Sequence, residues 1–259
     1  MTRNVGPEET PLHTVSALDH YEHCIAEGND PCEDGPVMQR YMARWDGPLF
    51  FDMLGNLTGK AVLEVGVGTG RLARQVLQRG CLRFIGIDLS PATIQRARRN
   101  LAGFPNVDLR VADIETMALP LVVDVAYSVL TFMHIADKER ALAAMVNALA
   151  PDGAVVLSIA HVTPRLDFGN RTVTLYPAPP TAYAAWLSDL GCSVTQASPL
   201  IDGWVGPDGQ RSETYGEPIA TLIKAVKVER RDPPVLCGAT RPIRPVGTPD
   251  RHRRGQGDG

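Results

Sequence analysis

The chain has 259 residues, 44% of them apolar, and a formal net charge of −3 at pH 7. These values allow one large α/β domain with elaborated ends, and the lack of a basic surplus argues against a nucleic-acid partner. No apolar run reaches membrane-span length and the first residues lack a signal-peptide core, so we expect a cytoplasmic protein with no membrane partner. Its five cysteines show no C-x-x-C spacing, so we expect free thiols and no metal site.

The N-terminal part of the chain is rich in proline, glycine and acidic residues. We predict a mobile segment over residues 1–36, with a short helix over 17–26. Over 37–54, apolar and aromatic residues recur at steps of three and four, and Gly47-Pro48 interrupts the series. This pattern predicts two short helices with a kink between them.

A strand, a tight turn and a helix are predicted around three alternating glycines. Residues 61–65 form an apolar run of strand length, Gly66, Gly68 and Gly70 follow, and apolar spacing is helical from Arg71 onward. A residue without a Cβ tolerates positive φ and lets a ligand approach the backbone, and the next helix presents unpaired N–H groups. The dinucleotide-binding pattern requires its third glycine at the position of Arg71, so a nicotinamide or flavin site fits poorly.

The second predicted strand covers residues 82–87 and ends in Asp88. This aspartate lies 22 positions after Gly66, close to the interval at which nucleoside-binding α/β proteins place a carboxylate for ribose hydroxyls. Asp88 is also suited to begin a turn, because Ser90 and Pro91 are typical of a helix N-cap and first helical position. The two roles are compatible, and ribose binding is the favoured interpretation.

The next strands alternate with helices along the chain. Residues 106–112 alternate apolar and polar side chains and end before Asp113, which either contacts a ligand or caps a turn. A fourth strand is predicted over 121–130, and a helix capped by Asp137 separates it from a fifth strand over 154–159. Repeated βα units predict a parallel sheet with helices on both faces.

The C-terminal third departs from this alternation. Prolines and a glycine break any element over residues 161–180, and we expect this insertion to contact substrate, because long irregular insertions in compact domains are often functional. A helix over 181–190 precedes two strands, 193–200 and 219–226, that are expected to pair antiparallel. Residues 228–259 are rich in arginine, proline and glycine, which predicts a disordered tail.

Residues 64–70, Glu-Val-Gly-Val-Gly-Thr-Gly, resemble the first motif of class I S-adenosylmethionine-dependent methyltransferases, an acidic residue followed by glycines at alternate positions. Residues 86–90 resemble the second motif and residues 113–114 the third. The resemblance implies a methyltransferase domain over 37–227, with a doubly wound, mostly parallel seven-stranded sheet whose last strand is antiparallel. It implies S-adenosylmethionine as cofactor, with contacts assigned to Glu64, Gly66, Gly68, Gly70, Asp88, Leu89, Asp113, Ile114 and Ser128.

The reaction implied by the resemblance is methyl transfer to an oxygen, nitrogen or carbon nucleophile. The motifs that DNA and protein-arginine methyltransferases place after the fourth strand are missing from residues 128–131, so a small-molecule acceptor is expected. His134 and His161 follow the fourth and fifth strands and are the candidate catalytic bases. A structural role is also open for both histidines.

The resemblance leaves several alternatives. The helices over 37–54 either cover the sheet edge or act as a lid that brings Tyr41, Arg44 and Trp45 to the pocket. The chain is either an enzyme or a non-catalytic S-adenosylmethionine-binding regulatory protein; a protein or RNA methyltransferase and an oxidoreductase are less favoured. We expect a monomer or a homodimer.

Overall fold

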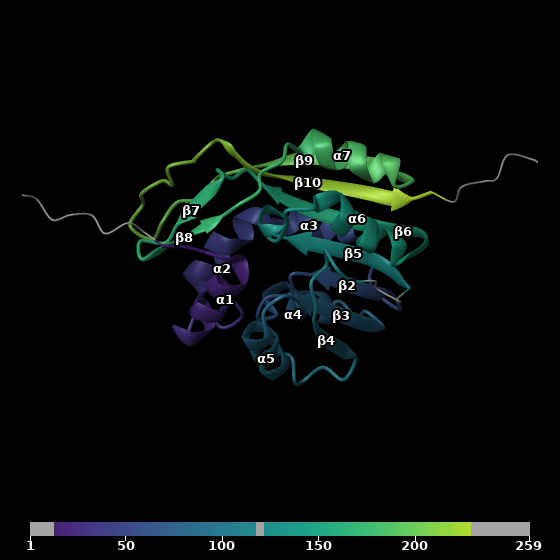
Figure 1. Ribbon diagram of the computed structural model, residues 1–259, viewed down its shortest axis with the longest axis horizontal. Helices are drawn as coiled ribbons and strands as arrows, with labels where there is room; N and C mark the ends of the chain where they lie inside the picture. The colour runs from purple at the N-terminus through teal and green to yellow at the C-terminus, as the bar shows by residue number, and fades with distance from the viewer. Residues whose placement is uncertain (1–12, 118–121, 229–259) are drawn as a thin grey trace, which may run out of the picture. The chain divides into compact units, whose positions relative to one another are not determined.

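The computed structural model describes residues 13–117 and 122–228 (Figure 1). The predicted mobility of the first twelve residues and the predicted disorder of the tail from residue 229 onward lie outside the described residues. In the described part of the chain, no helix is long and apolar enough to cross a membrane.

The middle of a central sheet is built from apolar runs that are buried on both faces, as expected for parallel strands covered by helices. In the described residues the sheet contains seven strands in the order β4-β3-β2-β5-β6-β10-β9. β10 is antiparallel to both β6 and β9, and the other neighbouring pairs are parallel. This confirms the predicted sheet. The strands are β2 Ala61–Val65, β3 Arg83–Asp88, β4 Val107–Val111, β5 Val123–Val129, β6 Leu149–Ala160, β9 Cys192–Ile201 and β10 Pro218–Lys227.

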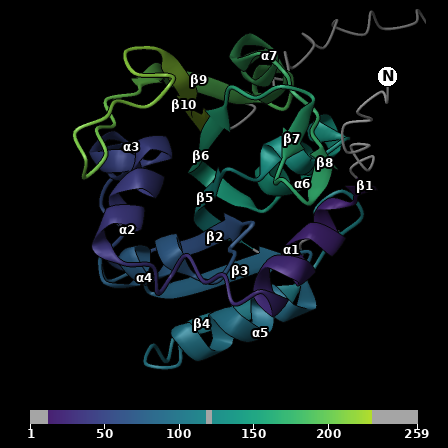
Figure 2. The same cartoon turned by 90° about the vertical axis from the view of Figure 1, so that its left-hand side faces the viewer.

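Helices pack on both faces of this sheet, each through an apolar stripe (Figures 1 and 2). One core cluster joins the sheet to α6 and α7, and a second joins it to α3, α4 and α5. The helices are α1 Ala17–Ala26, α2 Pro36–Met42, α3 Gly47–Leu54, α4 Arg71–Leu77, α5 Pro91–Asn100, α6 Lys138–Asn147 and α7 Pro180–Asp189, with short 3-10 turns at Ala43–Trp45 and Phe132–His134. Predicted caps hold: the Ser90 and Asp137 side chains accept backbone N–H groups of α5 and α6.

The N-terminal segment differs from the prediction of mobility wherever the structure describes it. Residues 13–36 contain β1 (His13–Val15) and α1, which matches the predicted helix over 17–26. The Ser16 hydroxyl caps α1, and α1 lies beside α5 (Figure 2). The folded unit therefore begins well before the predicted boundary at residue 37.

The insertion after the fifth strand also differs from the prediction. Residues 161–180 contain β7 (Arg165–Asp167) and β8 (Arg171–Thr174), which form a small sheet with β1 in the order β1-β8-β7. β1 pairs with β8 in parallel across a long sequence separation, so local periodicity does not reveal it. This pairing attaches the insertion to the N-terminal segment.

Candidate functional site

The glycine turn after β2 adopts the backbone that its sequence predicts. Gly66, Gly68 and Gly70 have φ of +78°, +56° and +97°, conformations that side chains with a Cβ rarely adopt. The glycines differ in surroundings: a Cβ on Gly66 would overlap the Thr131 side chain, one on Gly70 would press on Leu101 at 3.1 Å, and one on Gly68 would meet nothing within 4 Å. Open space therefore faces Gly68.

That space belongs to a cavity of about 230 Å³ at the carboxyl ends of four parallel strands. The strand order reverses between β2 and β5, and doubly wound sheets bind ligands in the crevice at such a point. The cavity is lined by residues 64–69 at the end of β2, 87–90 at the end of β3, 112–115 after β4 and 129–131 at the end of β5. Predicted site residues in the lining are Glu64, Gly66, Gly68, Asp88, Leu89, Asp113, Ile114 and His134.

Asp88 stands at the end of β3 with its carboxylate on the cavity. Its two oxygens accept the backbone N–H groups of Gly68 and Ser90, each at 3.0 Å. Burial nevertheless raises the pKa of Asp88, because these hydrogen bonds do not replace all of its lost hydration. The turn role and a ligand-binding role therefore coexist: the oxygens are oriented by the backbone and retain acceptor capacity.

Asp113 and Ile114 line the cavity from the end of β4. The Asp113 carboxylate accepts the Glu115 N–H at 2.9 Å, so the predicted turn role is present here too. Ile114 is 6% exposed, and Leu89 adds a second apolar side chain from the neighbouring strand end. Asp113 supplies a hydrogen-bond acceptor, and Ile114 and Leu89 supply apolar surface against which a flat heterocycle can pack.

Glu64 is the acidic residue of the glycine motif and is almost fully buried. The Tyr127 hydroxyl donates to its carboxylate at 2.8 Å, which also explains why Tyr127 lies in the core. Burial raises the pKa of Glu64 to about 8, against the opposing effect of the Tyr127 hydrogen bond. Glu64 is therefore largely protonated at neutral pH.

Three predicted site residues lie outside the cavity lining. The Ser128 hydroxyl donates to the Val65 carbonyl at 2.8 Å and is buried between two strands, because it points to the neighbouring strand rather than to the strand ends. Gly70 packs against Leu101. His161 is exposed, and its ring nitrogens lie 3.0 Å from the Pro218 carbonyl and the Thr221 hydroxyl, so it contacts the start of β10.

His134, by contrast, contacts the cavity from the 3-10 turn after β5. Its Nε2 lies 2.9 Å from the Tyr21 hydroxyl of α1, and its buried Nδ1 has no hydrogen-bond partner in the described residues. Burial lowers the pKa of His134 to about 4, so the imidazole is neutral at pH 7.

The sequence did not predict that α1 reaches the cavity. Ala17, Leu18 and Tyr21 line it, and the Glu22 carboxylate accepts the Ser90 hydroxyl at 2.6 Å and the Ala92 N–H at 3.0 Å. The available signal was the spacing of Leu18, Tyr21 and Ile25, which places apolar side chains on one helical face.

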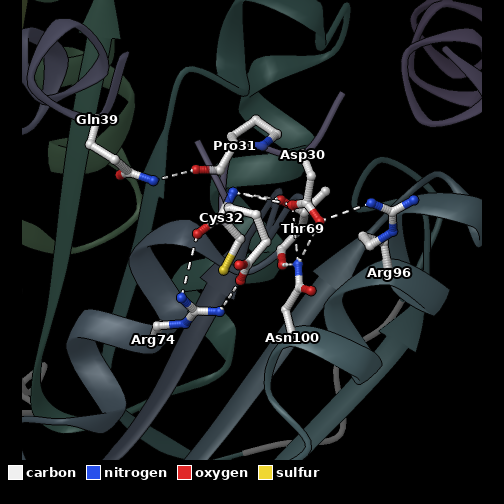
Figure 3. Close-up of polar contacts among 9 residues, drawn as sticks. Asp30, Pro31, Cys32, Gln39, Thr69, Arg74, Arg96 and Asn100 are labelled. Atoms are coloured by element: carbon white, nitrogen blue, oxygen red, sulfur yellow. Dashed lines mark hydrogen bonds and ion pairs between the residues drawn. The ribbon is translucent and has the colours of Figure 1, made fainter. Parts of the chain in front are cut away.

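The segment between α1 and α2 is fixed over the glycine turn by a polar cluster (Figure 3). Asp30 accepts from Arg96 at 2.9 Å and from Asn100 at 3.1 Å, and Asn100 also donates to the Thr69 carbonyl at 2.9 Å. The Cys32 N–H lies 3.2 Å from the Thr69 hydroxyl. Pro31, at the centre of this segment, lines the cavity.

The predicted lid residues and insertion do not line this cavity. Arg44 lies over the Tyr41 and Trp45 rings and pairs with Asp202 at 2.7 Å, which joins these residues to the loop between β9 and β10. From the helices over 37–54, only Met42 reaches the lining. Residues 161–180 instead contact α1, through Arg171 and Glu27 at 2.8 Å. No group of three metal-ligating side chains occurs among the described residues.

Comparison with known proteins gives a partial match to a family model. Residues 62–153 match a family model described as a methyltransferase domain. A ubiquinone biosynthesis O-methyltransferase from Neisseria meningitidis serogroup C is 31% identical over 121 residues, which are 45% of this chain and 50% of that protein. The chain spans about a third to a half of the length of the curated relatives it matches.

Solved structures share the fold. An S-adenosylmethionine-dependent methyltransferase from Mesorhizobium loti superposes with a TM-score of 0.58 at 22% identity, over 71% of this chain and 98% of that chain. Magnesium protoporphyrin IX methyltransferase from Synechocystis PCC 6803, solved with bound S-adenosylmethionine, gives a TM-score of 0.59 at 16% identity, over 81% and 94%. Residues 62–153 therefore match a methyltransferase domain, and the chain has the fold of solved S-adenosylmethionine-dependent methyltransferases.

Proposed function

We propose that the chain binds S-adenosylmethionine in this cavity and catalyses transfer of its methyl group to a small-molecule nucleophile. The observation that carries the proposal is the convergence of three separate strand ends on one cavity. The glycine turn after β2, Asp88 after β3 and Asp113 after β4 all line it. Fold alone does not determine function, but these side chains have the chemistry that an adenosyl group requires.

The residues present fit the cofactor. Asp88 supplies acceptor oxygens for the ribose hydroxyls, and Asp113 supplies one for the adenine amino group. Leu89 and Ile114 provide apolar surface for the ring. The open space at Gly68 allows close approach of a ligand to the backbone, which a Cβ would prevent.

The cofactor supplies an already activated methyl group on a sulfonium. The chain has to hold the acceptor in line with that group and keep water away. Orientation of this kind is worth about 7–11 kcal/mol in favourable cases. α1 and the fixed segment around Pro31 supply the enclosure, since both line the cavity from the N-terminal side of the chain.

A small-molecule acceptor is supported by the relatives. The Neisseria protein is named for ubiquinone biosynthesis and the Synechocystis protein for magnesium protoporphyrin IX. The net charge of −3 provides no overall attraction for nucleic acid. A cavity of about 230 Å³ also favours a small acceptor over a macromolecular one.

Calorimetry combined with a transfer assay tests the proposal. S-adenosylmethionine and S-adenosylhomocysteine should bind at one site, and Asp88→Ala should weaken binding at least tenfold, because a hydrogen bond to a charged group contributes about 1.5–3 kcal/mol. Asp108→Ala is the matched control, since Asp108 is a carboxylate on β4 that pairs with Arg83 and Arg110. Unchanged affinity in Asp88→Ala would remove this residue from the site. Cofactor binding with no transfer of labelled methyl to any metabolite extract would indicate the regulatory alternative.

A further inference from the structure

The polar groups that remain for an acceptor are few. Apart from the residues assigned to the cofactor, the polar side chains in the described lining are those of Tyr21, Thr69, Arg71, Ser90, Glu115, Thr131 and His134. The Thr69 hydroxyl accepts the Cys32 N–H at 3.2 Å, Arg71 pairs with Asp46, and the Ser90 hydroxyl donates to Glu22 at 2.6 Å. Thr131 donates to the Val129 carbonyl at 3.2 Å, and Glu115 accepts the Asp137 N–H at 2.6 Å. The Tyr21–His134 pair is thus left as a polar contact for an acceptor, beside apolar Leu18 and Ile135.

The hydrogen bond between Tyr21 and His134 determines which donors and acceptors the pair presents to a methyl acceptor. A buried N–H without a partner is rare and costly, and Nδ1 of His134 has no partner in the described residues. We therefore assign the ring proton to Nε2, which donates to the Tyr21 oxygen at 2.9 Å. The Tyr21 oxygen then keeps one free lone pair and its own O–H. In this tautomer no basic nitrogen of the pair faces the cavity.

The pair is also a poor proton acceptor in its other tautomer. The pKa of His134 is lowered to about 4 by burial and secondarily by His20, whereas a phenol has a pKa of about 10 and an alcohol a higher one. The pKa of Tyr21 is raised by burial and by the charges of Asp88 and Cys24, so it does not supply a phenolate. The Tyr21–His134 pair therefore contains no group that would take the proton of an alcohol or phenol acceptor.

Charge in the lining disfavours an anionic acceptor. Four carboxyl side chains line the cavity; Glu64 is largely protonated at neutral pH, which leaves Asp88, Asp113 and Glu115 as the acidic side chains that face an acceptor. In the described lining Arg71 is the only lysine or arginine, and its guanidinium pairs with Asp46 at 2.5 Å. From the described side chains of the lining, a carboxylate or phenolate acceptor would meet acidic groups and no unpaired lysine or arginine.

We infer that the acceptor is an amine in its uncharged form, held by an N–H group that donates to the Tyr21 oxygen while the nitrogen lone pair points to the methyl group. The inference rests on the proposed function. The nitrogen–carbon bond forms as the carbon–sulfur bond breaks, and the positive charge passes from sulfur to nitrogen. The ammonium product loses its proton to water, so no protein base is needed.

The test uses deuteromethyl-labelled S-adenosylmethionine, the full chain and small-metabolite extracts split into amine and amine-free fractions by cation exchange. We expect label in N-methyl products of the amine fraction, identified by mass spectrometry. Label in a methyl ether or ester overturns the inference and leaves methyl transfer intact. No label in either fraction, with cofactor binding intact by calorimetry, overturns the proposed function instead.

A variant tests the role of Tyr21 with the acceptor so identified. Tyr21→Phe should raise the KM for the amine at least tenfold and leave the cofactor Kd within twofold. Tyr215→Phe is the matched control, since Tyr215 is 40% exposed and outside the cavity lining, and it should change neither constant. Loss of cofactor affinity in Tyr21→Phe with an unchanged KM would show that Tyr21 only supports the packing of α1.

Discussion

At the residue scale, Gly66 and Gly68 of the glycine turn have different structural roles. Gly66 allows the backbone to pass the Thr131 side chain, whereas Gly68 leaves space on the cavity side. Both glycines have positive φ, so backbone conformation explains why each position is a glycine. At Gly68 the space that a ligand would occupy is a second reason. The two positions can therefore be separated experimentally.

Gly66→Ala should reduce stability more than Gly68→Ala, and Gly68→Ala should reduce cofactor affinity in a folded protein. A left-handed non-glycine residue costs about 1–2 kcal/mol, and overlap with Thr131 adds about 1–3 kcal/mol at Gly66. Urea denaturation and calorimetry measure the two effects. Equal destabilisation by both substitutions would contradict the assignment of Thr131 as the obstacle.

Glu64 makes the stability of the free protein depend on pH. Its pKa is about 8 in the folded protein against 4.5 as the ordinary value, so between these values the folded state holds more protons than the unfolded state. The stabilisation is complete below about pH 4.5 and is lost as the pH rises through about 8, with a slope of up to about 1.4 kcal/mol per pH unit.

Glu64→Gln should remove this part of the pH dependence. Denaturation of both proteins at several values between pH 5 and 8 isolates the effect, because contributions from other groups, such as the lowered pKa of His134, are common to both. The difference in unfolding free energy should shift in favour of the variant as the pH rises. A constant difference across this range would show that Glu64 titrates normally.

At the scale of elements, the N-terminal segment is part of the site. α1 contributes cavity side chains, and the segment after it is fixed to the glycine turn and to α5 by Asp30 (Figure 3). The Asp30 side chain is 7% exposed, whereas Glu33, three residues later, pairs with Arg74 at 60% exposure. The buried Asp30 pair should therefore contribute more to the free energy of unfolding than the Glu33 pair, because water screens the exposed pair.

Asp30→Ala should lower the free energy of unfolding by about 2–3 kcal/mol, because it leaves Arg96 and Asn100 without their buried acceptor. Glu33→Ala, the matched control, should cost less than about 1 kcal/mol. Urea denaturation of the two variants gives the comparison. Similar losses would mean that the cluster does not fix the segment.

At the scale of the whole domain, the cavity exists only when four strand ends and α1 are assembled, so ligand binding should stabilise the entire folded unit. At a concentration about 100 times its Kd, S-adenosylhomocysteine should raise the free energy of unfolding by about 2.7 kcal/mol. Thermal denaturation measures this, and Asp88→Ala should show a smaller increase at the same concentration. Stabilisation by NAD and none by S-adenosylhomocysteine would favour the oxidoreductase alternative.

Local sequence patterns were sufficient to predict the strands and helices of the parallel part of the sheet. Strand and helix periods, the glycine turn and the caps at Ser90 and Asp137 depend on neighbours in the chain, and they appear in the structure as predicted. The spacing from Gly66 indicated Asp88, and the motif resemblance added the seven-stranded sheet and the cavity residues Asp113 and Ile114. These residues meet in one cavity because consecutive parallel strands end on the same edge.

Only the tertiary structure decided which other side chains reach the cavity. Ser128 lies near the end of β5 and His161 follows β6, but the Ser128 side chain points to a neighbouring strand and His161 lies on the surface. Tyr21 meets His134 across 113 positions, and β1 pairs with β8 across more. Such contacts depend on how packed elements meet, which periodicity does not encode, whereas the turn and strand-end positions follow from local backbone chemistry.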